Sequence, residues 1–571
     1  MTTIDDCYRG FRETYLDYAA LSEQLHTWAE AFSHCTRLQS LGRTPEGRDI
    51  WLFSIAGDPG RAGPAVWVDG NMHAGEVAGS SAALAIAEAA LRVHVGGEPL
   101  LDLPEAQMDV LRSVTFHVCP RISPDGAEAV LREGGFVRSV PRRWREDRRD
   151  PYWLPQDIDG DGVRRYMRLP DAAGEFVESG EHPGLMLPRR IQDPPPYYRV
   201  YPEGVIENFD GRTIPEPQFL ADTTDLNRNF PWDWAPEPEQ AGAGSYPGSE
   251  PESRAVLEWS SRHPELYAWL NLHTYGGVFI RPLGHERDVR MNRADLAVYR
   301  QLGAWGEELV GYPTVSGYEE FTYEPEKPLH GDLTDYAYNA RGCLAIVCEI
   351  WDLFHQVGLP EPRPFVHRYT ALSRDDLRKL ADWDRAENQG RVFQAWKRHH
   401  HPQLGEVEIG GPDPRIGLRN PPPERLPAIC EGLAGYWLRV AALLPRLVVE
   451  DSGSERTGGD VSCVTVTVAN QGYLPTWGLS SSRELTWNTP VYAELRTQGC
   501  ELLDAGSARR EVGHLRGWGR GLGEHADAPL YMRSGGSDNR RTLSWHVKGS
   551  GAVVVRVGSA RVGWQEVEVR V

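Results

Sequence analysis

Short β-branched and apolar runs alternate with longer helical patterns between about residues 15 and 446. Such alternation is typical of a sheet flanked by helices, because each layer buries its apolar face against the other. The runs that we expect to form strands are residues 51–56, 65–69, 114–119, 267–272 and 344–348. The alanine-rich stretch 82–91 predicts a helix instead. We therefore expect an α/β fold in which a mixed, twisted sheet is flanked by helices.

The pattern changes near residues 445–459, and a chain of 571 residues exceeds the length of a single core. Five later segments alternate apolar and polar residues between Gly, Asn and Ser turns: 462–468, 491–495, 542–547, 552–557 and 564–571. Alternating strands at this spacing predict an all-β sandwich. We expect domains at residues 1–446 and 447–571. Within the first, residues 142–218 are dense in Pro, Asp, Gly and Arg and predict a long insertion or lid.

The charge balance restricts the partners of the chain. Lys and Arg number 61 against 81 Asp and Glu, so the formal net charge is −20, which argues against nucleic acid or an anionic membrane as partner. The N-terminus lacks a basic segment followed by an apolar one, and no stretch approaches the roughly 20 apolar residues of a membrane span. We expect a cytoplasmic protein. Its eight cysteines form no C-x-x-C pair and predict buried thiols rather than disulfides.

His73 and Glu76 lie three positions apart, where an apolar run meets the alanine-rich helical run. Both side chains can turn toward one metal ion, although an H-x-x-E pair alone arises often by chance. His273 follows another apolar strand, and strand ends deliver ligands in open α/β sheets. Two His and one Glu leave the fourth position of zinc open for water. This is the arrangement of a catalytic zinc site.

A concentrated polar run at residues 225–231 offers candidate substrate contacts. The guanidinium of Arg228 can grip a carboxylate with two parallel hydrogen bonds, and Asn227 can add a donor. Asp225 can accept the second ring proton of His73 and fix its tautomer. The same run could instead be a loop held by side-chain caps.

Glu349 ends the apolar strand 344–348, where an acid without a partner costs stability, so a catalytic or ligand role is favoured. Together with their surrounding letters, six residues occur in the order typical of one family: His73, Glu76, Asn227, Arg228, His273 and Glu349. The chain resembles the zinc carboxypeptidases of the carboxypeptidase A type. The resemblance covers residues 15–446, including the Ser-Pro-Asp-Gly turn at 123–126.

The resemblance implies three ligands for one Zn²⁺ ion: His73, Glu76 and His273. Glu349 would be the general base, which takes a proton from zinc-activated water and passes it to the leaving amine. Asn227 and Arg228 would hold the terminal α-carboxylate of a peptide. The protein would then be a metallocarboxypeptidase that acts on peptides with a free C-terminal carboxylate. The sequence leaves the oligomeric state open.

Three further residues take roles by position in the family pattern. Arg138 follows the 123–126 turn at the spacing of the arginine that stabilises the oxyanion. The insertion offers rival arginines: Arg142, Arg143, Arg145 and Arg168. Tyr323 matches the mobile phenol that covers the substrate, and Thr334 matches the specificity pocket. Gly75 stands where the digestive members carry an arginine, so one positive contact is absent from that position.

Two readings remain for the acidic stretch within the insertion. Asp157, Asp159 and Asp161 alternate before Gly162 like the start of a calcium loop, or form an Asp/Gly turn network. Other activities also stay open for the whole chain. One is an amidase or isopeptidase of the same fold that acts on cell-wall peptides or acyl amino acids. The other is a non-catalytic binding protein, which would have no need of Glu349.

Overall fold

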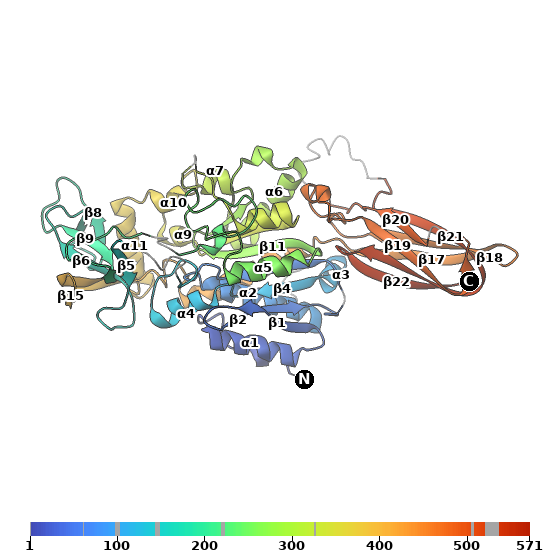
Figure 1. The fold of residues 1–571 in the computed structure, drawn as a ribbon, viewed down its shortest axis with the longest axis horizontal. Coiled ribbons are helices and arrows are strands. Elements are labelled where there is room, and N and C mark those ends of the chain that lie inside the picture. Colours follow the sequence, from blue (N-terminus) through green and yellow to red (C-terminus); the bar gives the residue numbers. More distant parts are fainter. Residues whose placement is uncertain are drawn as a thin grey trace.

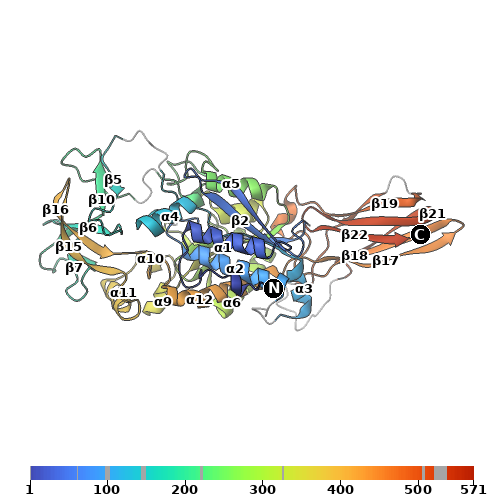
Figure 2. The same cartoon turned by 90° about the horizontal axis from the view of Figure 1, so that it is seen from below.

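Three regions follow one another along the long axis of the molecule in the computed structural model (Figures 1 and 2). The structure describes residues 2–60, 62–96, 103–142, 149–218, 223–324, 327–503, 508–519 and 536–571. A central α/β region lies between a small β region, built largely from the insertion, and a C-terminal β region. Within the described residues, no helix combines the length and apolar character that a membrane span requires.

The central region is built on an eight-stranded sheet in the order β1-β2-β4-β3-β11-β14-β12-β13. Its strands are β1 (Thr36–Arg43), β2 (Asp49–Ile55), β3 (Ala65–Gly70), β4 (Thr115–Cys119), β11 (Leu266–Thr274), β12 (Val278–Arg281), β13 (Thr314–Ser316) and β14 (Leu344–Ile350). The four middle strands β4, β3, β11 and β14 are parallel, whereas β2 and β12 run antiparallel to their inner neighbours. Strands β3 and β11 are buried along their whole length, as expected when helices cover both faces. The predicted mixed sheet with flanking helices is confirmed.

The longer helices around this sheet are α1 (Tyr18–Ala31), α2 (Ala78–Val95), α3 (Glu105–Ser113), α4 (Pro124–Glu133), α5 (Pro251–Ser261), α6 (Arg293–Val310), α11 (Arg374–Glu387) and α12 (Leu426–Ala441). Shorter ones are α7 (Gly317–Phe321), α8 (Leu333–Asp335), α9 (Leu353–Val357) and α10 (His367–Thr370). Helix α2 is buried from residue 78 to residue 91, because the sheet covers one side and α12 another. Its start touches the end of β3 so closely that a Cβ on Gly70 would lie 2.5 Å from the Gly79 carbonyl oxygen.

The insertion contributes to a second sheet instead of forming a separate loop or lid. Its strands are β5 (Tyr152–Pro155), β6 (Tyr166–Pro170), β7 (Phe176–Glu178), β8 (Met186–Pro188), β9 (Tyr198–Pro202) and β10 (Gly204–Glu207). Two strands from far along the chain, β15 (Phe393–His401) and β16 (Gly405–Pro412), complete the order β15-β16-β6-β9-β7-β8. Strands β10 and β5 pair beside it. This sheet therefore joins two parts of the chain that the sequence pattern treats as unrelated.

The C-terminal region is all antiparallel, as predicted. It contains β17 (Leu447–Gly458), β18 (Val461–Asn470), β19 (Val491–Leu502), β20 (Arg509–Gly513), β21 (Arg540–Ser559) and β22 (Gly563–Arg570). The segments 542–547 and 552–557, predicted as two strands, belong to the single long strand β21. Because β21 pairs with β18 in its first half and with β22 in its second, the sheet curls and brings β22 against β17.

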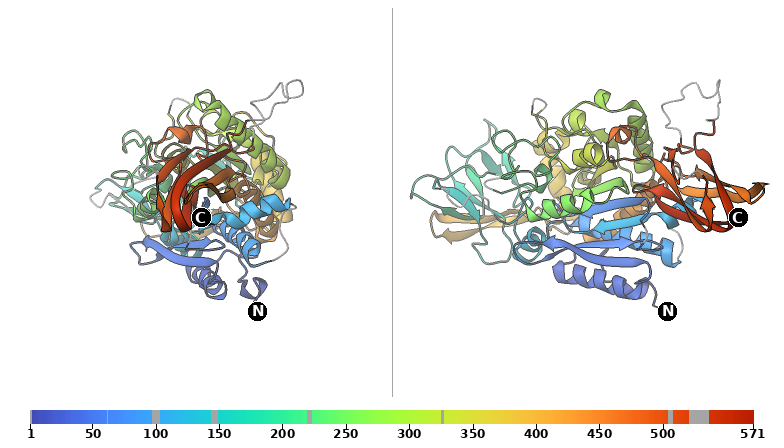
Figure 3. Two further views of the ribbon diagram at one scale, coloured as in Figure 1. Left: turned by 90° about the vertical axis from the view of Figure 1, so that its right-hand side faces the viewer. Right: turned by 45° about the vertical axis from the view of Figure 1, so that its right-hand side comes forward.

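The C-terminal region adjoins one end of the central region (Figure 3). Arg561 links the two regions. Its side chain is 2% exposed, and its guanidinium lies 4.4 Å from the ring centroid of Tyr267 in β11. Nη2 donates to the carbonyl oxygen of Gly342 over 2.9 Å. The two regions thus share buried polar contacts as well as a chain link.

Candidate metal centre

The three predicted metal ligands lie at the carboxyl ends of two neighbouring parallel strands. Strand β3 ends at Gly70, and the loop from there to α2 carries His73 and Glu76. His273 is the penultimate residue of β11, which pairs with β3. All three side chains are buried and together form a set that could hold a metal ion. The parallel pairing brings the two strand ends to one edge of the sheet, where open α/β sheets place their ligands.

Three acceptor atoms converge at this point. Nδ1 of His73 lies 2.9 Å from Oε1 of Glu76, and Nδ1 of His273 lies 3.0 Å both from Oε2 of Glu76 and from Nδ1 of His73. The Nε2 atoms face oxygens, Asp225 Oδ1 at 3.1 Å and Asn271 Oδ1 at 2.5 Å. Each neutral ring therefore carries its proton on Nε2 and leaves a lone pair on Nδ1. Two lone pairs and a carboxylate in contact fit a zinc ion.

A buried chain of hydrogen bonds fixes the ring of His273. Asn271 accepts from His273 and turns its amide nitrogen toward Asp69. Asp69 also accepts from the indole nitrogens of Trp67 over 2.7 Å and Trp269 over 2.8 Å. Burial raises the pKa of Asp69 to about 6. Our sequence reasoning missed this support, although an acid inside the apolar run 65–69 was a visible signal.

Asp225 and Arg138 support the other histidine. Asp225 accepts from His73 through Oδ1 and from Nε of Arg138 through Oδ2, the latter over 2.9 Å. Burial by itself would raise the pKa of Asp225, but the charge of Arg138 and the hydrogen bond from His73 hold it well below its usual range. Nη1 of Arg138 lies 3.5 Å from Oε1 of Glu76. The guanidinium therefore borders the predicted metal ligands.

The other candidate arginines in the described part of the insertion lie elsewhere. Arg142 pairs with Glu250 and Glu252 at the start of helix α5. Helix α5 begins at Pro251, after Glu250, whose side chain makes no capping hydrogen bond. Arg168 stacks within the second sheet, 4.1 Å from the ring centroid of Tyr198. Arg143 and Arg145 fall outside the described residues.

Glu349 lies opposite His273 in the register of β11 and β14, so the two side chains leave the sheet on the same face. Burial, and then the negative charge of Glu76, raise the pKa of Glu349 well above its ordinary value. The Glu349 carboxylate forms no ion pair with the described residues. A carboxyl group that is held beside three ligands without a partner of its own is available to accept a proton.

Asn227 and Arg228 lie in the single turn Leu226–Arg228 on another wall of the same cavity. The Asn227 amide is engaged: its oxygen accepts from Leu333 N over 2.9 Å and its nitrogen donates to Asp332 over 3.2 Å. Arg228 donates to the carbonyl oxygen of Asn227 over 2.6 Å but forms no ion pair within the described residues. Burial, and then Asp335, raise the pKa of Asp332 to about 6.

The cavity has a volume of about 550 Å³ and brings together every predicted ligand, catalytic and substrate-binding residue. These are His73, Glu76, Arg138, Asp225, Asn227, Arg228, His273, Tyr323, Thr334 and Glu349. Tyr323 is 54% exposed, as suits a side chain at the rim. The hydroxyl of Thr334 is buried and has no hydrogen-bond partner among the described residues. One concave site thus collects residues from widely separated segments.

Asn420 holds the metal-binding loop in place and was not predicted. It is fully buried, and its amide nitrogen donates to the carbonyl oxygen of Gly75 over 2.7 Å. Its amide oxygen accepts from Ala78 N over 3.0 Å. Helix α2 has no capping side chain of its own at Val77, so a remote residue satisfies its first N–H group.

We expect Asn420→Ala to lower the free energy of unfolding by about 1–3 kcal/mol, because it leaves two buried backbone groups unpaired. Zinc affinity should fall as well, since the loop that carries His73 and Glu76 loses its tether. Asn420→Asp retains the acceptor for Ala78 and should show a smaller loss. Urea unfolding and competition with a zinc chelator measure both effects. An unfolding free energy equal to wild type in Asn420→Ala would contradict this role.

The contacts of the acidic stretch in the insertion favour the Asp/Gly turn network over a calcium site. Asp157 and Asp159 come together with Glu203, whereas Asp161 is not part of that group and pairs with Arg165 instead. The carboxylates already accept backbone N–H groups, as in Gly160 N to Asp157 Oδ1 over 2.7 Å. The His-His-His run at 399–401, whose neighbours in the sequence suggest an exposed turn, instead ends strand β15, and His401 is fully buried.

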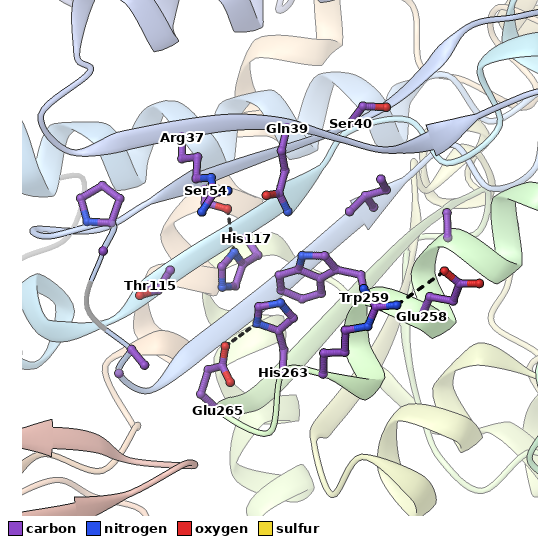
Figure 4. A pocket seen from close by; sticks show the side chains of 17 residues that line it. Arg37, Gln39, Ser40, Ser54, Thr115, His117, Glu258, Trp259, His263 and Glu265 are labelled. Atoms are coloured by element: carbon purple, nitrogen blue, oxygen red, sulfur yellow. Dashed lines mark hydrogen bonds and ion pairs between the residues drawn. The ribbon is translucent and has the colours of Figure 1, made fainter.

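A second cavity, of about 510 Å³, lies beside β1, β2, β4 and α5 and contains none of the predicted site residues (Figure 4). Two of its histidines pair with other lining residues. Ser54 Oγ lies 2.8 Å from His117 Nδ1, and His263 Nδ1 lies 2.6 Å from Glu265 Oε1. Burial lowers the pKa of His117 to about 3, so this ring is neutral. The metal-binding chemistry therefore belongs to the first cavity.

Comparisons with known proteins agree with this site. The model of the family described as zinc carboxypeptidase matches residues 21–364, so the chain belongs to the zinc carboxypeptidase family. Residues 446–570 match a domain of unknown function (DUF8731). Membership of the family implies a Zn²⁺ cofactor, for which His73, Glu76 and His273 are the matching donor set.

Individual relatives are distant. Carboxypeptidase Z of Homo sapiens is 26% identical over 238 residues, which are 40% of this chain and 33% of that protein. Carboxypeptidase D of Mus musculus is 31% identical over 121 residues, 21% of this chain and 8% of that protein. The chain thus spans a third or less of these relatives. The crystal structure of thrombin activatable fibrinolysis inhibitor aligns with a TM-score of 0.42 at 14% identity, covering 77% of this chain and 76% of that one.

Proposed function

We propose that the protein is a zinc-dependent metallocarboxypeptidase that hydrolyses the C-terminal peptide bond of peptides. One observation carries the proposal. The proton-free acceptors of His73, Glu76 and His273 share a cavity with an unpaired carboxyl group, Glu349, and with a guanidinium that has no ion pair in the described residues, Arg228. Membership of the zinc carboxypeptidase family supports the same activity.

The residues that line the cavity have separate roles in this reaction. A bound Zn²⁺ ion would polarise the scissile carbonyl and lower the pKa of water. Glu349 takes a proton from the attacking water and returns it to the leaving amine. Arg138, fixed by Asp225, stabilises the negative charge that develops on the carbonyl oxygen. Arg228 binds the terminal carboxylate, and Tyr323 at the rim covers the substrate.

The activity is tested by zinc content and by release of free amino acids from a broad panel of N-blocked dipeptides. A zinc-loaded protein that cleaves none of them would contradict the proposal.

The same assay tests the role of Arg228. We expect Arg228→Ala to reduce kcat/KM by about 10- to 100-fold on a dipeptide acid, because a charge-assisted bidentate contact is lost.

The matched substrate for Arg228 is the C-terminal amide of the same dipeptide. Wild type should discriminate strongly against this amide, and Arg228→Ala should discriminate weakly. If the variant preserves the wild-type ratio between acid and amide, another residue binds the carboxylate.

Asp332 favours a second candidate, an isopeptidase of the same fold. Its carboxylate contacts the amide of Asn227, beside Arg228. An anion next to a cation suits a leaving group that carries both a free amine and a carboxylate, as in an isopeptide-linked amino acid. Comparing an N-blocked dipeptide with an ε-linked acyl-lysine distinguishes the two, since only an isopeptidase would favour the second substrate.

A further inference from the structure

Arg419 brings a positive charge into the cavity from outside the segment that matches the family. It belongs to the stretch between β16 and α12, beyond residue 364, where the family match ends. Its guanidinium lies 4.2 Å from the ring centroid of Phe136, and its side chain lines the same cavity as Glu76 and Glu349. The metal centre thus has a cationic neighbour that the ligand motifs do not include.

This cation forms no ion pair within the part of the chain that the structure describes, although its charge acts on the carboxylates of Glu76 and Glu349 across the cavity. Arg138, by contrast, is held by Asp225, and Arg415 in the same stretch as Arg419 is held by Asp413 over 2.8 Å. Burial lowers the pKa of Arg419. Arg419 is half-buried, and removing even part of a charge from water without a counter-ion is costly. An unpaired guanidinium on a cavity wall is therefore poised for an anionic ligand.

The backbone of Arg419 is fixed relative to the metal ligands. Its neighbour Asn420 is bonded to Gly75 and Ala78, and its own N–H donates to the Pro414 carbonyl oxygen over 2.9 Å. A Cβ on Gly75 would lie 3.8 Å from Cδ of Arg419, so the Arg419 side chain packs beside the loop that carries His73 and Glu76. The base of the Arg419 side chain is thereby positioned relative to the metal ligands, and the guanidinium packs on Phe136.

Arg419 borders a different part of the cavity from Arg228. Arg228 adjoins Asn227, which contacts Asp332 and Leu333. Arg419 contacts Phe136 and lies electrostatically close to Tyr275, to Glu76 and Arg138 at the metal site, and to Tyr166. Tyr166 opens strand β6 of the second sheet. A peptide whose C-terminal residue lies at Arg228 would extend its remaining residues past the metal ligands, toward that sheet.

We propose that Arg419 binds a carboxylate in the acyl half of the substrate, the part upstream of the scissile bond, and so selects acidic peptides. The inference rests on the proposed carboxypeptidase function. It makes Arg419 a specificity-determining residue, supplied by the stretch that joins the second sheet to α12.

The test compares acetyl-Glu-X with acetyl-Gln-X, where X is the residue released fastest in the dipeptide panel. We expect wild type to favour the Glu peptide by about 10- to 100-fold in kcat/KM, the range for a hydrogen bond to a charged group. Arg419→Gln should bring this ratio close to one through loss of rate on the Glu peptide, and Arg419→Lys should retain part of it. Arg398→Gln, on an exposed stretch of β15, is the matched control and should leave the ratio unchanged.

A binding measurement keeps the result independent of turnover. Zinc-loaded Glu349→Gln protein is titrated calorimetrically with both peptides, with and without Arg419→Gln. A tenfold or greater preference for the Glu peptide that disappears in the double variant supports the inference. Equal affinities overturn it, as does a kinetic preference that survives Arg419→Gln. Failure of the carboxypeptidase proposal can be distinguished from failure of the Arg419 inference. In the first case no dipeptide is cleaved, and the calorimetric comparison still decides the role of Arg419.

Discussion

Glu349→Gln is expected to reduce kcat by about 10²- to 10⁴-fold, the range that general acid–base catalysis contributes. The amide matches the carboxyl group in size but accepts no proton at neutral pH, so the attacking water loses its base. Zinc should remain bound, because the ligands are His73, Glu76 and His273. Steady-state kinetics and metal analysis of the same preparation measure both outcomes.

Glu431→Gln is a suitable control, because Glu431 is exposed on α12 and does not line the cavity. It should leave both kcat and zinc content unchanged. Wild-type turnover in Glu349→Gln would refute the assignment of the base. A variant that has lost its zinc would instead show that Glu349 supports the metal site.

Removal of the metal is expected to abolish peptidase activity and to lower the melting temperature. Without a cation, two nitrogen lone pairs and a carboxylate repel one another at about 3 Å. An ion that binds only the folded state stabilises it by about 2.7 kcal/mol when its free concentration is 100 times Kd. Dialysis against a chelator, followed by calorimetry and assay, measures the loss.

Addition of one equivalent of Zn²⁺ should restore both properties. His273→Ala provides the matched variant, since it removes one donor and should not recover with the same addition. Full activity in protein shown to be free of metal would exclude this mechanism. An unchanged melting temperature after chelation would show that the ligands are held apart by the fold alone.

The local pattern of the sequence predicts the central sheet well, because strand burial leaves a mark on consecutive residues. Strands β3, β11 and β14 occur within one or two residues of the predicted runs at their starts. The edge strand β17 is different, since its exposed residues 450–458 carry no alternating apolar signal. The two strands predicted within β21 were separated by a Gly-Ser-Gly stretch that the sheet continues through.

The strand pairing of the second sheet could not be predicted from the local sequence pattern. Strand β6 pairs with β16, so the partner of residue 168 is residue 408. No periodicity in either segment specifies the other, because a ladder is formed by backbone groups that every residue has. The proline and glycine content of the insertion therefore predicts a loop, although long-range pairing makes strands of it.

In the candidate site, too, some residues have a local sequence signal and others depend on long-range contacts. Residue type and position at strand ends made it possible to predict His73, Glu76 and His273 from the sequence. The structure brings these three side chains together, as expected. Asn420 and Arg419 have no motif. Their meaning comes from contacts with Gly75 and Phe136, which lie far away in the chain. Only the folded arrangement could show that they belong to the site.

The tether between Asn420 and Gly75 has a consequence for the order in which this molecule becomes an enzyme. Domains generally fold from the N-terminus during synthesis. The loop with His73 and Glu76 leaves the ribosome early, but its last two hydrogen bonds wait for residue 420. The stretch that provides them also carries the charge of Arg419. The catalytic cavity is therefore finished only after β15 and β16 have been made and joined to the insertion, so an unfinished chain lacks a complete hydrolytic site.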